Sequence, residues 1–409
     1  MAFHHGLSGL NAASKKLDVV GQNIANSSTV GFKASRAEFT AMVASAMGGC
    51  GCGTGIGVTS SVSQQFSQGV ITPTSNALDM AINGNGFFCV QTAAGDTAYT
   101  RMGNFQLNKS GELVTIHGDK VMGYPIDPAT GGVSDTRGTI TFPTGGIPAK
   151  PTAIINVALN LGARTPETPA GSTANRAASG TSLQVYDSLG IAHPVSLYFE
   201  RSGTQADNTW EVFDGLDDPT ATPPVVANSL GTIQFNPDGS ILTTPATLTL
   251  TVDPDPATGA TQPFDVNVDL SKVTQYGNSF SVSKLSQDGY AAGEFIGASV
   301  SEDGTLMASY SNGVTRGEVR MAMATFINPQ GLSPASNGNW IASAASGEPV
   351  PGTAGAGNFG SITGSALEES NVDLTAELVE MMTAQRYYQA NAQTIKTQDE
   401  AFSTITNMR

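Results

Sequence analysis

The C-terminal stretch 370–409 reads SNVDLTAELVEMMTAQRYYQANAQTIKTQDEAFSTITNMR. It contains neither Gly nor Pro, and Ser370 to Asp373 match the capping-box form that starts a helix. At ~1.5 Å per residue the predicted helix is ~55 Å long, more than one small domain covers. Its apolar side chains recur every seven residues, as in a coiled-coil seam, at Leu374, Met381, Tyr388, Ile395 and Phe402, with Leu378 and Ala392 four positions after two of them.

The N-terminal stretch 1–30 repeats this period. Phe3, Leu10, Leu17 and Ile24 are seven residues apart, and Ala13 and Val20 follow two of them by three positions. We therefore predict that the terminal helices pair as a coiled coil and that the chain assembles through this seam. The alternative is that each helix lies on the core of its own domain. The predicted assembly seam consists of Leu10, Leu17, Ile24, Leu374, Leu378, Met381, Tyr388, Ile395 and Phe402.

The apolar stripe of this seam is thin, with Gln385 and Asp399 at partner positions of the C-terminal repeat. Isolated helices gain little stability from helix propensity alone. We therefore expect both ends to be loosely ordered in the monomer and to become fixed on assembly.

Composition excludes several classes of function. The 409 residues carry 19 basic and 34 acidic side chains, a net charge of −15, with no basic run that would bind nucleic acid. No apolar stretch approaches the ~20 residues of a membrane span, and the N-terminus lacks the features of a secretory signal peptide. Three cysteines and four scattered histidines give no disulfide framework or metal spacing. Acidic pairs such as Asp217-Asp218 are typical of a solvated surface. We predict neither an enzyme nor a bound cofactor.

The middle of the chain has the sequence pattern of β structure. All 21 prolines lie between Pro73 and Pro351, so only the two ends are free of them. Alternating or fully apolar segments lie between turn signals, which predicts antiparallel sheets in sandwiches or partial barrels. The turn signals are Asn83-Gly84-Asn85-Gly86, Ser110-Gly111, Asp187-Ser188-Leu189-Gly190, Pro237-Asp238-Gly239, Glu302-Asp303-Gly304 and Asn312-Gly313.

A change in composition predicts one domain inserted into another. Residues 145–285 hold 13 of the 21 prolines and repeated Thr, Ala and Pro tracts. The glycine-rich run GGCGCGTGIG at 48–57, which includes Cys50 and Cys52, is typical of a flexible hinge. The predicted parts are a terminal helical domain (1–30 with 370–409), a linker (31–72 with 357–369), an inner β domain (73–145 with 285–356) and an inserted outer β domain (146–284).

Four motifs, in the same order along the chain, resemble the signatures of bacterial flagellar rod and hook proteins. They are ANSSTVGFK from Ala25, ALDMAINGNGFF from Ala77, YTRMGNFQLNKSGELV from Tyr99, and ALEESNVDLTAELVEMMTAQRYYQANAQTIKTQ from Ala366. Rod proteins of this family are shorter and lack the insertion, so the length favours the hook proteins. The motif and turn residues that we single out are Asn26, Gly31, Phe32, Asn83, Gly84 and Gly86.

The resemblance implies a structural subunit that polymerises with itself into a short curved tube joining rod to filament, and that transmits torque as a universal joint. It also implies three protein partners: the hook cap, distal rod and hook–filament junction proteins. Passage through the flagellar type III export apparatus without a cleaved signal, and an extracellular location in the hook, follow from the same resemblance. Met381→Asp is expected to leave the β domains folded and to abolish assembly.

Two other readings remain open at this point. A distal rod subunit shares the signatures but forms a straight, rigid tube. A secreted β-rich adhesin or glycan-active protein shares the β texture, although it has no need of heptads at both ends.

Overall fold

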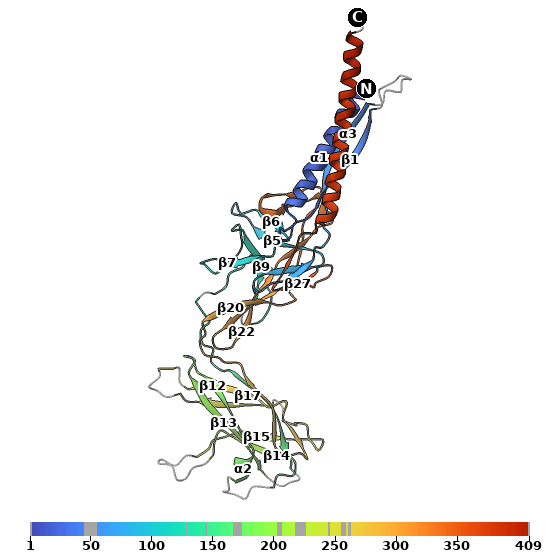
Figure 1. Cartoon of the computed structure of the whole chain (residues 1–409). Helices are drawn as coiled ribbons and strands as arrows, with labels where there is room; N and C mark the ends of the chain where they lie inside the picture. Colours follow the sequence, from blue (N-terminus) through green and yellow to red (C-terminus); the bar gives the residue numbers. More distant parts are fainter. Residues whose placement is uncertain are drawn as a thin grey trace. The chain divides into compact units, whose positions relative to one another are not determined.

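A computed structural model describes residues 2–44, 55–127, 130–143, 145–166, 174–202, 207–216, 226–243, 246–254, 259–260 and 263–407. The chain forms two compact units. The first consists of Met1–Thr144, Gly297–Ser309 and Thr315–Arg409, and the second of Gly145–Ile296 and Tyr310–Val314. The expectation of a mainly β protein with a helix near each end is confirmed (Figure 1).

Two long helices belong to the first unit, α1 (Ala2–Ala25) and α3 (Leu374–Asn407). The carboxylate of Asp373 caps α3, because its Oδ1 accepts hydrogen bonds from the amides of Thr375 (2.9 Å) and Ala376 (3.2 Å). The capping box predicted at Ser370 is therefore wrong by three residues. Asp373 satisfies the free amides of the first turn and places a negative charge at the positive end of the helix dipole.

A long hairpin occupies most of the predicted linker 31–72. Strand β1 (Ser35–Ala44) pairs antiparallel with β2 (Gly55–Gln64) over ten residue pairs, from Ser35 opposite Gln64 to Ala44 opposite Gly55. The predicted linker 31–72 therefore contains two paired strands, and ladder hydrogen bonds satisfy their backbone groups. Residues 45–54, with Cys50 and Cys52, lie outside the described residues.

The core of the first unit is a large antiparallel sheet. Among the described residues it has 13 strands, with the main order β20-β21-β22-β9-β5-β6-β25-β24. Two short turns of 3-10 helix, Pro329–Gly331 and Ser336–Gly338, border β24. The strands are β5 (Phe87–Gln91), β6 (Thr97–Thr100), β7 (Phe105–Leu107), β8 (Leu113–Thr115), β9 (Lys120–Pro125), β10 (Gly138–Thr139), β20 (Phe295–Val300), β21 (Thr305–Tyr310), β22 (Thr315–Met321), β23 (Met323–Thr325), β24 (Ser333–Pro334), β25 (Asn339–Ile341) and β26 (Val350–Gly352).

Aromatic side chains link the hairpin to this sheet. The ring of Phe66, just after β2, lies edge-on to Phe87 and to Trp340, with 5.5 Å between centroids in both pairs. The Trp340 indole N–H donates to the side chain of Gln64 at the end of β2 (2.5 Å). Edge-to-face pairs of this kind stabilise beyond the area that they bury, so the base of the hairpin is fixed to the β core.

Two small sheets bring the C-terminal part of the chain back to the N-terminal part. Strand β4 (Met80–Asn83) pairs with β27 (Ser361–Gly364), and β3 (Ile71–Pro73) pairs with β28 (Ala366–Glu368), both antiparallel. These pairs place Glu368 beside the chain that leaves α1.

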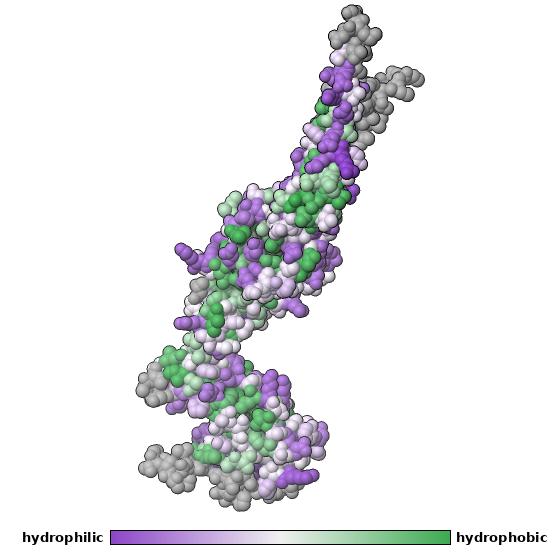
Figure 2. Space-filling view, in the orientation of Figure 1, coloured by the Kyte–Doolittle hydropathy of each residue, from purple (hydrophilic) through white to green (hydrophobic). Residues whose placement is uncertain are grey.

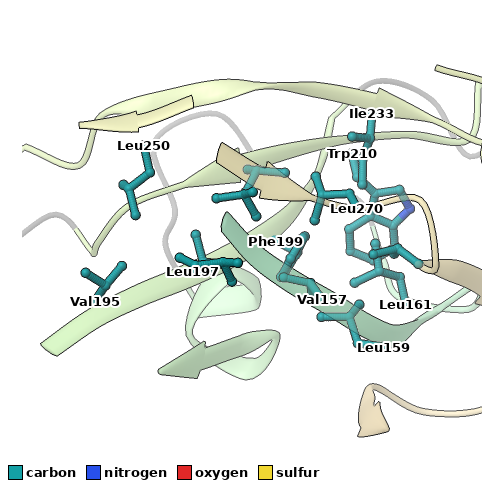
Figure 3. Packing of buried hydrophobic residues seen from close by; sticks show 14 of the residues in the cluster. Val157, Leu159, Leu161, Val195, Leu197, Phe199, Trp210, Ile233, Leu250 and Leu270 are labelled. Atoms are coloured by element: carbon teal, nitrogen blue, oxygen red, sulfur yellow. The ribbon is translucent and has the colours of Figure 1, made fainter. Parts of the chain in front are cut away.

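The second unit is a sandwich of two sheets that share one apolar core. Side chains from both sheets meet around Trp210 and Phe199, both fully buried (Figure 3). A short helix α2 (Ala174–Ala178) precedes the four-stranded sheet. That sheet contains β12 (Gly180–Tyr186), β13 (Ala192–Ser202), β14 (Thr209–Phe213) and β15 (Ser229–Gln234); the other contains β11 (Ile154–Gly162), β16 (Thr247–Val252), β17 (Phe264–Asp269), β18 (Thr274–Tyr276) and β19 (Ser281–Gln287).

The expectation of purely antiparallel sheets is wrong for β11, which pairs parallel with β17 and with β18. Parallel neighbours require a long crossover connection, and the whole four-stranded sheet lies between β11 and β17 in the sequence. The predicted insertion, 146–284, falls within this unit, which also includes residues 285–296 and the turn 310–314.

The turn that begins at Asp187 contains a buried carboxylate. Its Oδ1 accepts hydrogen bonds from the amides of Leu189 and Ile191, both at 2.9 Å, and its Oδ2 lies 3.0 Å from Nε2 of His193. Burial alone raises the pKa of Asp187, but the His193 ring and the two amides outweigh it, so the pKa is lowered.

We predict that Asp187→Asn destabilises the second unit at pH 7 and that this loss shrinks as the pH falls below about 4. The native pKa lies below that of the unfolded chain, so the stabilisation exists above the unfolded value and disappears as the carboxylate is protonated. Urea unfolding of Trp340→Phe chains at pH 7 and pH 3, followed by Trp210 fluorescence, measures it.

Asp238→Asn is the matched control, because Asp238 occupies an exposed turn of the same unit and caps Ser240 in a similar way. Asp238→Asn should lower the free energy of unfolding by less than Asp187→Asn does at both pH values. Equal losses for Asp187→Asn at pH 7 and pH 3 would contradict the prediction.

Candidate assembly interface

The two terminal helices run antiparallel and side by side in the first unit (Figure 1). Gly6 and Gly9 of α1 face the C-terminal half of α3: a Cβ added at Gly6 would lie 2.9 Å from Cγ1 of Ile395, and one at Gly9 would lie 2.7 Å from Oδ1 of Asn391. The helices therefore approach through positions that hold no side chain. Ala13 of α1 and Ala384 of α3, both buried, continue this contact with small side chains.

The structure places the predicted seam residues in two groups. Leu10, Leu17, Ile24, Met381 and Ile395 are half-buried. Tyr388 is 38% exposed, while Leu374 and Leu378 are 46% and 41% exposed; the side chain of Phe402 lies outside the described residues.

After Glu377 and Met381, the more buried positions of α3 are Ala384, Asn391, Ala392, Ile395 and Gln398. Most of them lie three residues after a predicted apolar position, and of the two companions predicted four residues after, Ala392 is half-buried and Leu378 is exposed. Leu378 consequently faces away from α1. The glycine and polar residues of this contact, such as Gly9 and Asn391, were not predicted because a heptad pattern counts only apolar side chains.

Polar side chains tie the helix pair to the start of the hairpin. The amide of Asn23 donates to Oε1 of Glu377 (2.9 Å) and to the carbonyl of Ser35 (2.8 Å), and its Oδ1 accepts from the Ser35 amide (2.9 Å). Lys16 and Glu380 form an ion pair at 3.3 Å. Burial raises the pKa of Glu377, and the nearby charges of Glu380 and Asp373 act in the same direction.

A buried charge cluster lies where the helix pair meets the β core. The carboxylate of Glu368 contacts Nζ of Lys33 at 2.6 Å and Nη1 of Arg101 at 3.2 Å. It also accepts a hydrogen bond from the amide of Gly69 (2.9 Å), while Lys33 donates to the carbonyl of Ser67 (2.8 Å). Every segment that leaves or enters the helix pair is therefore bound to this one carboxylate or to its partners.

Motif residues from the N-terminus surround this cluster. Gly31 has a φ of 68°, and a Cβ there would lie 2.7 Å from the carbonyl carbon of Arg101, so glycine is required. Its amide donates to the carbonyl of Glu368 (2.7 Å). Asn26 caps the end of α1 through a hydrogen bond to the carbonyl of Gln22 (2.9 Å). Phe32, singled out as a motif residue of this turn, is half-buried, whereas its neighbour Lys33 is buried.

The second motif supplies the opposite wall. The carbonyl of Gly84 accepts a hydrogen bond from Nη2 of Arg101 (2.8 Å), and the side chain of Gln68 contacts Oδ1 of Asn83 (3.3 Å). A Cβ at Gly86 would lie 2.6 Å from the Met323 side chain. Asn83 and Gly84 thus lie at the same junction as Gly31, whereas Gly86 packs against β23. The sequence pattern predicted the two turns but not that they meet.

Within the part of the chain that the structure describes, no three His, Cys, Asp or Glu side chains are grouped in a way that would hold a metal ion. No helix among the described residues is both long and apolar enough to cross a membrane.

Four family models match successive parts of the chain. Those of the flagellar hook protein FlgE/F/G D1 domain and the flagellar basal body protein FlaE D2 domain match residues 81–158 and 158–290. Those of the flagella basal body rod protein and the flagellar basal body rod FlgEFG protein C-terminal match residues 3–33 and 363–408.

Curated relatives match from end to end. The flagellar hook protein FlgE of Salmonella typhimurium is 38% identical over 417 aligned residues, which cover 100% of both chains. That of Escherichia coli is 37% identical over 419 residues, again 100% of both, and that of Rhizobium meliloti is 35% identical over 99% of this chain and 98% of its own. The chain belongs to the flagellar hook protein family.

A solved structure supports the fold of this hook-family chain. The crystal structure of Helicobacter pylori flagellar hook protein FlgE2 matches with a TM-score of 0.53, at 14% identity, over 73% of this chain and 100% of that chain. At this identity the likeness concerns the fold alone.

We predict that Gly9→Val destabilises the packing of α1 on α3 by about 1–3 kcal/mol, because the added methyl groups meet the Asn391 side chain. The matched control is Gly21→Ala on the same helix, where an added Cβ has no neighbour within 4 Å. That change should stabilise α1 by roughly 0.5–1 kcal/mol.

Amide exchange of α1 in the full chain measures both effects. Unchanged protection of α1 in Gly9→Val, or a loss in Gly21→Ala equal to it, would show that close approach through Gly9 is unimportant.

Proposed function

We infer that this chain is a structural subunit of the bacterial flagellar hook. The end-to-end similarity to named hook proteins carries this inference, and it favours a hook subunit over an adhesin or a glycan-active protein. Rod-family models match only the two ends, so the full-length similarity also favours the hook over the distal rod. The subunit polymerises with itself into a tube that joins rod to filament and transmits torque.

An unpartnered apolar face of α3 supports polymerisation. Leu374, Leu378, Val379 and Met382 are between 41% and 53% exposed, and Figure 2 shows apolar surface over the lower turns of this helix. At 100° per residue, Leu378 and Met382 fall on the side of α3 that faces away from α1, and Leu374 lies at the border of this side, about 20° from Met381. Exposed apolar faces of this kind mark interaction sites, and in a homopolymer the terminal domain of the next copy covers this one.

The lengths of the helices support the same conclusion. Helix α3 has 34 residues and α1 has 24, so α1 cannot cover α3 along its whole length. A contact between different surface patches of identical subunits generates a ring or, when the rotation does not close, an open helical assembly, rather than a two-fold dimer. Both features are those expected of a tube subunit.

The remaining partners follow from the family resemblance: the hook cap protein, the distal rod protein, the hook–filament junction protein and the flagellar type III export apparatus. The proposed location is the extracellular hook. Its action as a universal joint requires interfaces that slide at modest cost, and the second unit, built as a separate sandwich with its own core, is suited to such contacts.

Variants of two neighbouring methionines of α3 distinguish an effect on assembly from an effect on folding. Met382→Asp places a charge on the exposed face, so it should block polymerisation and change stability by less than about 0.5 kcal/mol. Met381→Asp places the charge in the contact with α1, so it should block polymerisation and also destabilise the helix pair by roughly 2–4 kcal/mol.

Electron microscopy of concentrated protein and thermal unfolding of dilute protein measure the two properties. Met382→Leu is the conservative control and should form tubes. Normal tubes from Met382→Asp would contradict the role of the exposed face, and normal tubes from Met381→Asp would contradict the role of the helix pair.

A further inference from the structure

The cluster around Glu368 contains one acidic group and two basic groups, all buried. The side chains of Lys33 and Glu368 have no exposed surface, and that of Arg101 is 5% exposed. Burial lowers the pKa of both Lys33 and Arg101, and Glu368 opposes this effect in each case. Without Glu368, the site would hold two buried cations and no counter-ion.

These three residues come from distant parts of the sequence. Glu368 follows Lys33 by 335 residues and Arg101 by 267 residues, with the whole second unit between them. It belongs to residues 366–371, which we name the C-terminal strap. The strap pairs through β28 with β3, and its Asn371 side chain accepts from the Ala34 amide (2.7 Å) and donates to the Gln65 carbonyl (2.8 Å).

A cluster of packed apolar residues would stabilise this junction at least as well as the ionic one. Replacing a buried ion pair by packed apolar residues is often neutral or stabilising, whereas removing one partner strongly destabilises. An ionic cluster differs from an apolar one in that its parts depend on one another. Lys33 and Arg101 cannot be buried favourably until the carboxylate of Glu368 is present.

We propose that Glu368 is an ionic latch that makes docking of the N-terminal connection, residues 31–34, conditional on arrival of the C-terminal strap. Before the strap docks, Lys33 stays in solvent and the exit of α1 is not fixed to the β core. When the strap docks, its carboxylate neutralises Lys33 and Arg101 together, so both ends of the chain become fixed in one step. This is a property of the single chain and does not depend on polymerisation.

The equilibrium test compares the full chain with Glu368→Gln, which keeps the size of the side chain and removes its charge. The rate of Lys33 acetylation by an amine-reactive ester, read by mass spectrometry, should increase on the order of 100-fold. The Glu369 amide, which donates to the carbonyl of Val70 (2.8 Å), should stay protected from exchange within about tenfold, because strap pairing persists. Lys120, whose ion pair with Glu112 is partly exposed, is the labelling control and should react equally in both chains.

A second variant distinguishes charge from shape. Lys33→Met in the Glu368→Gln background removes one of the uncompensated cations, so protection of the Gly31 amide should return most of the way to the wild-type value. Lys33 that stays unreactive in Glu368→Gln would overturn the latch. If Lys33→Met does not restore protection of the Gly31 amide, the latch does not depend on charge.

Refolding of the wild-type chain tests the order of events. Pulses of acetylating reagent and of deuterium during refolding should show Lys33 losing reactivity in the same kinetic phase in which the Glu369 amide becomes protected. Lys33 that becomes unreactive in an earlier phase would contradict conditional docking.

Discussion

The buried carboxylate of Glu368 is the contact on which the terminal part of the first unit depends. It compensates the charges of Lys33 and Arg101 and accepts a hydrogen bond from the amide of Gly69. The chain that leaves α1, the base of the hairpin and the strand before α3 all meet there. Because a buried charge without a partner is costly, this one group sets where both terminal helices join the β core.

The helix pair that extends from this junction is built for contact rather than for independent stability. Glycines of α1 allow close approach to Ile395 and Asn391, and large apolar side chains such as Leu378 and Met382 remain on the outside of α3. A helix pair that buried all its apolar surface internally would leave nothing for a neighbouring copy. This exposed face is the surface that we propose a neighbouring copy covers.

The sequence predicted the features that local patterns encode. Seven-residue spacing identified α1 and α3, and Asn-Gly and Asp-Gly pairs marked turns in which Gly84, Gly239 and Gly313 have positive φ. Family signatures indicated the hook family, and three of these motifs contain Lys33, Arg101 and Glu368 of the junction.

Long-range pairing was not accessible from these patterns. The glycine-rich run 48–57 predicted a hinge, although β1 and β2, which begins within this run at Gly55, form a hairpin. Glu368 is one carboxylate in an acidic pair, and nothing local shows that its partners lie 335 and 267 residues earlier. The parallel pairing of β11 likewise depends on a connection through a whole sheet.

The most direct measurement of the central claim, that this chain assembles through its terminal helices, is electron microscopy under salting-out conditions. It compares the full chain with one lacking residues 2–25 and 374–407. The full chain should form tubes, and the shortened chain should remain monomeric with its second unit folded. Tubes from both chains, or a full chain that stays monomeric, would contradict the account.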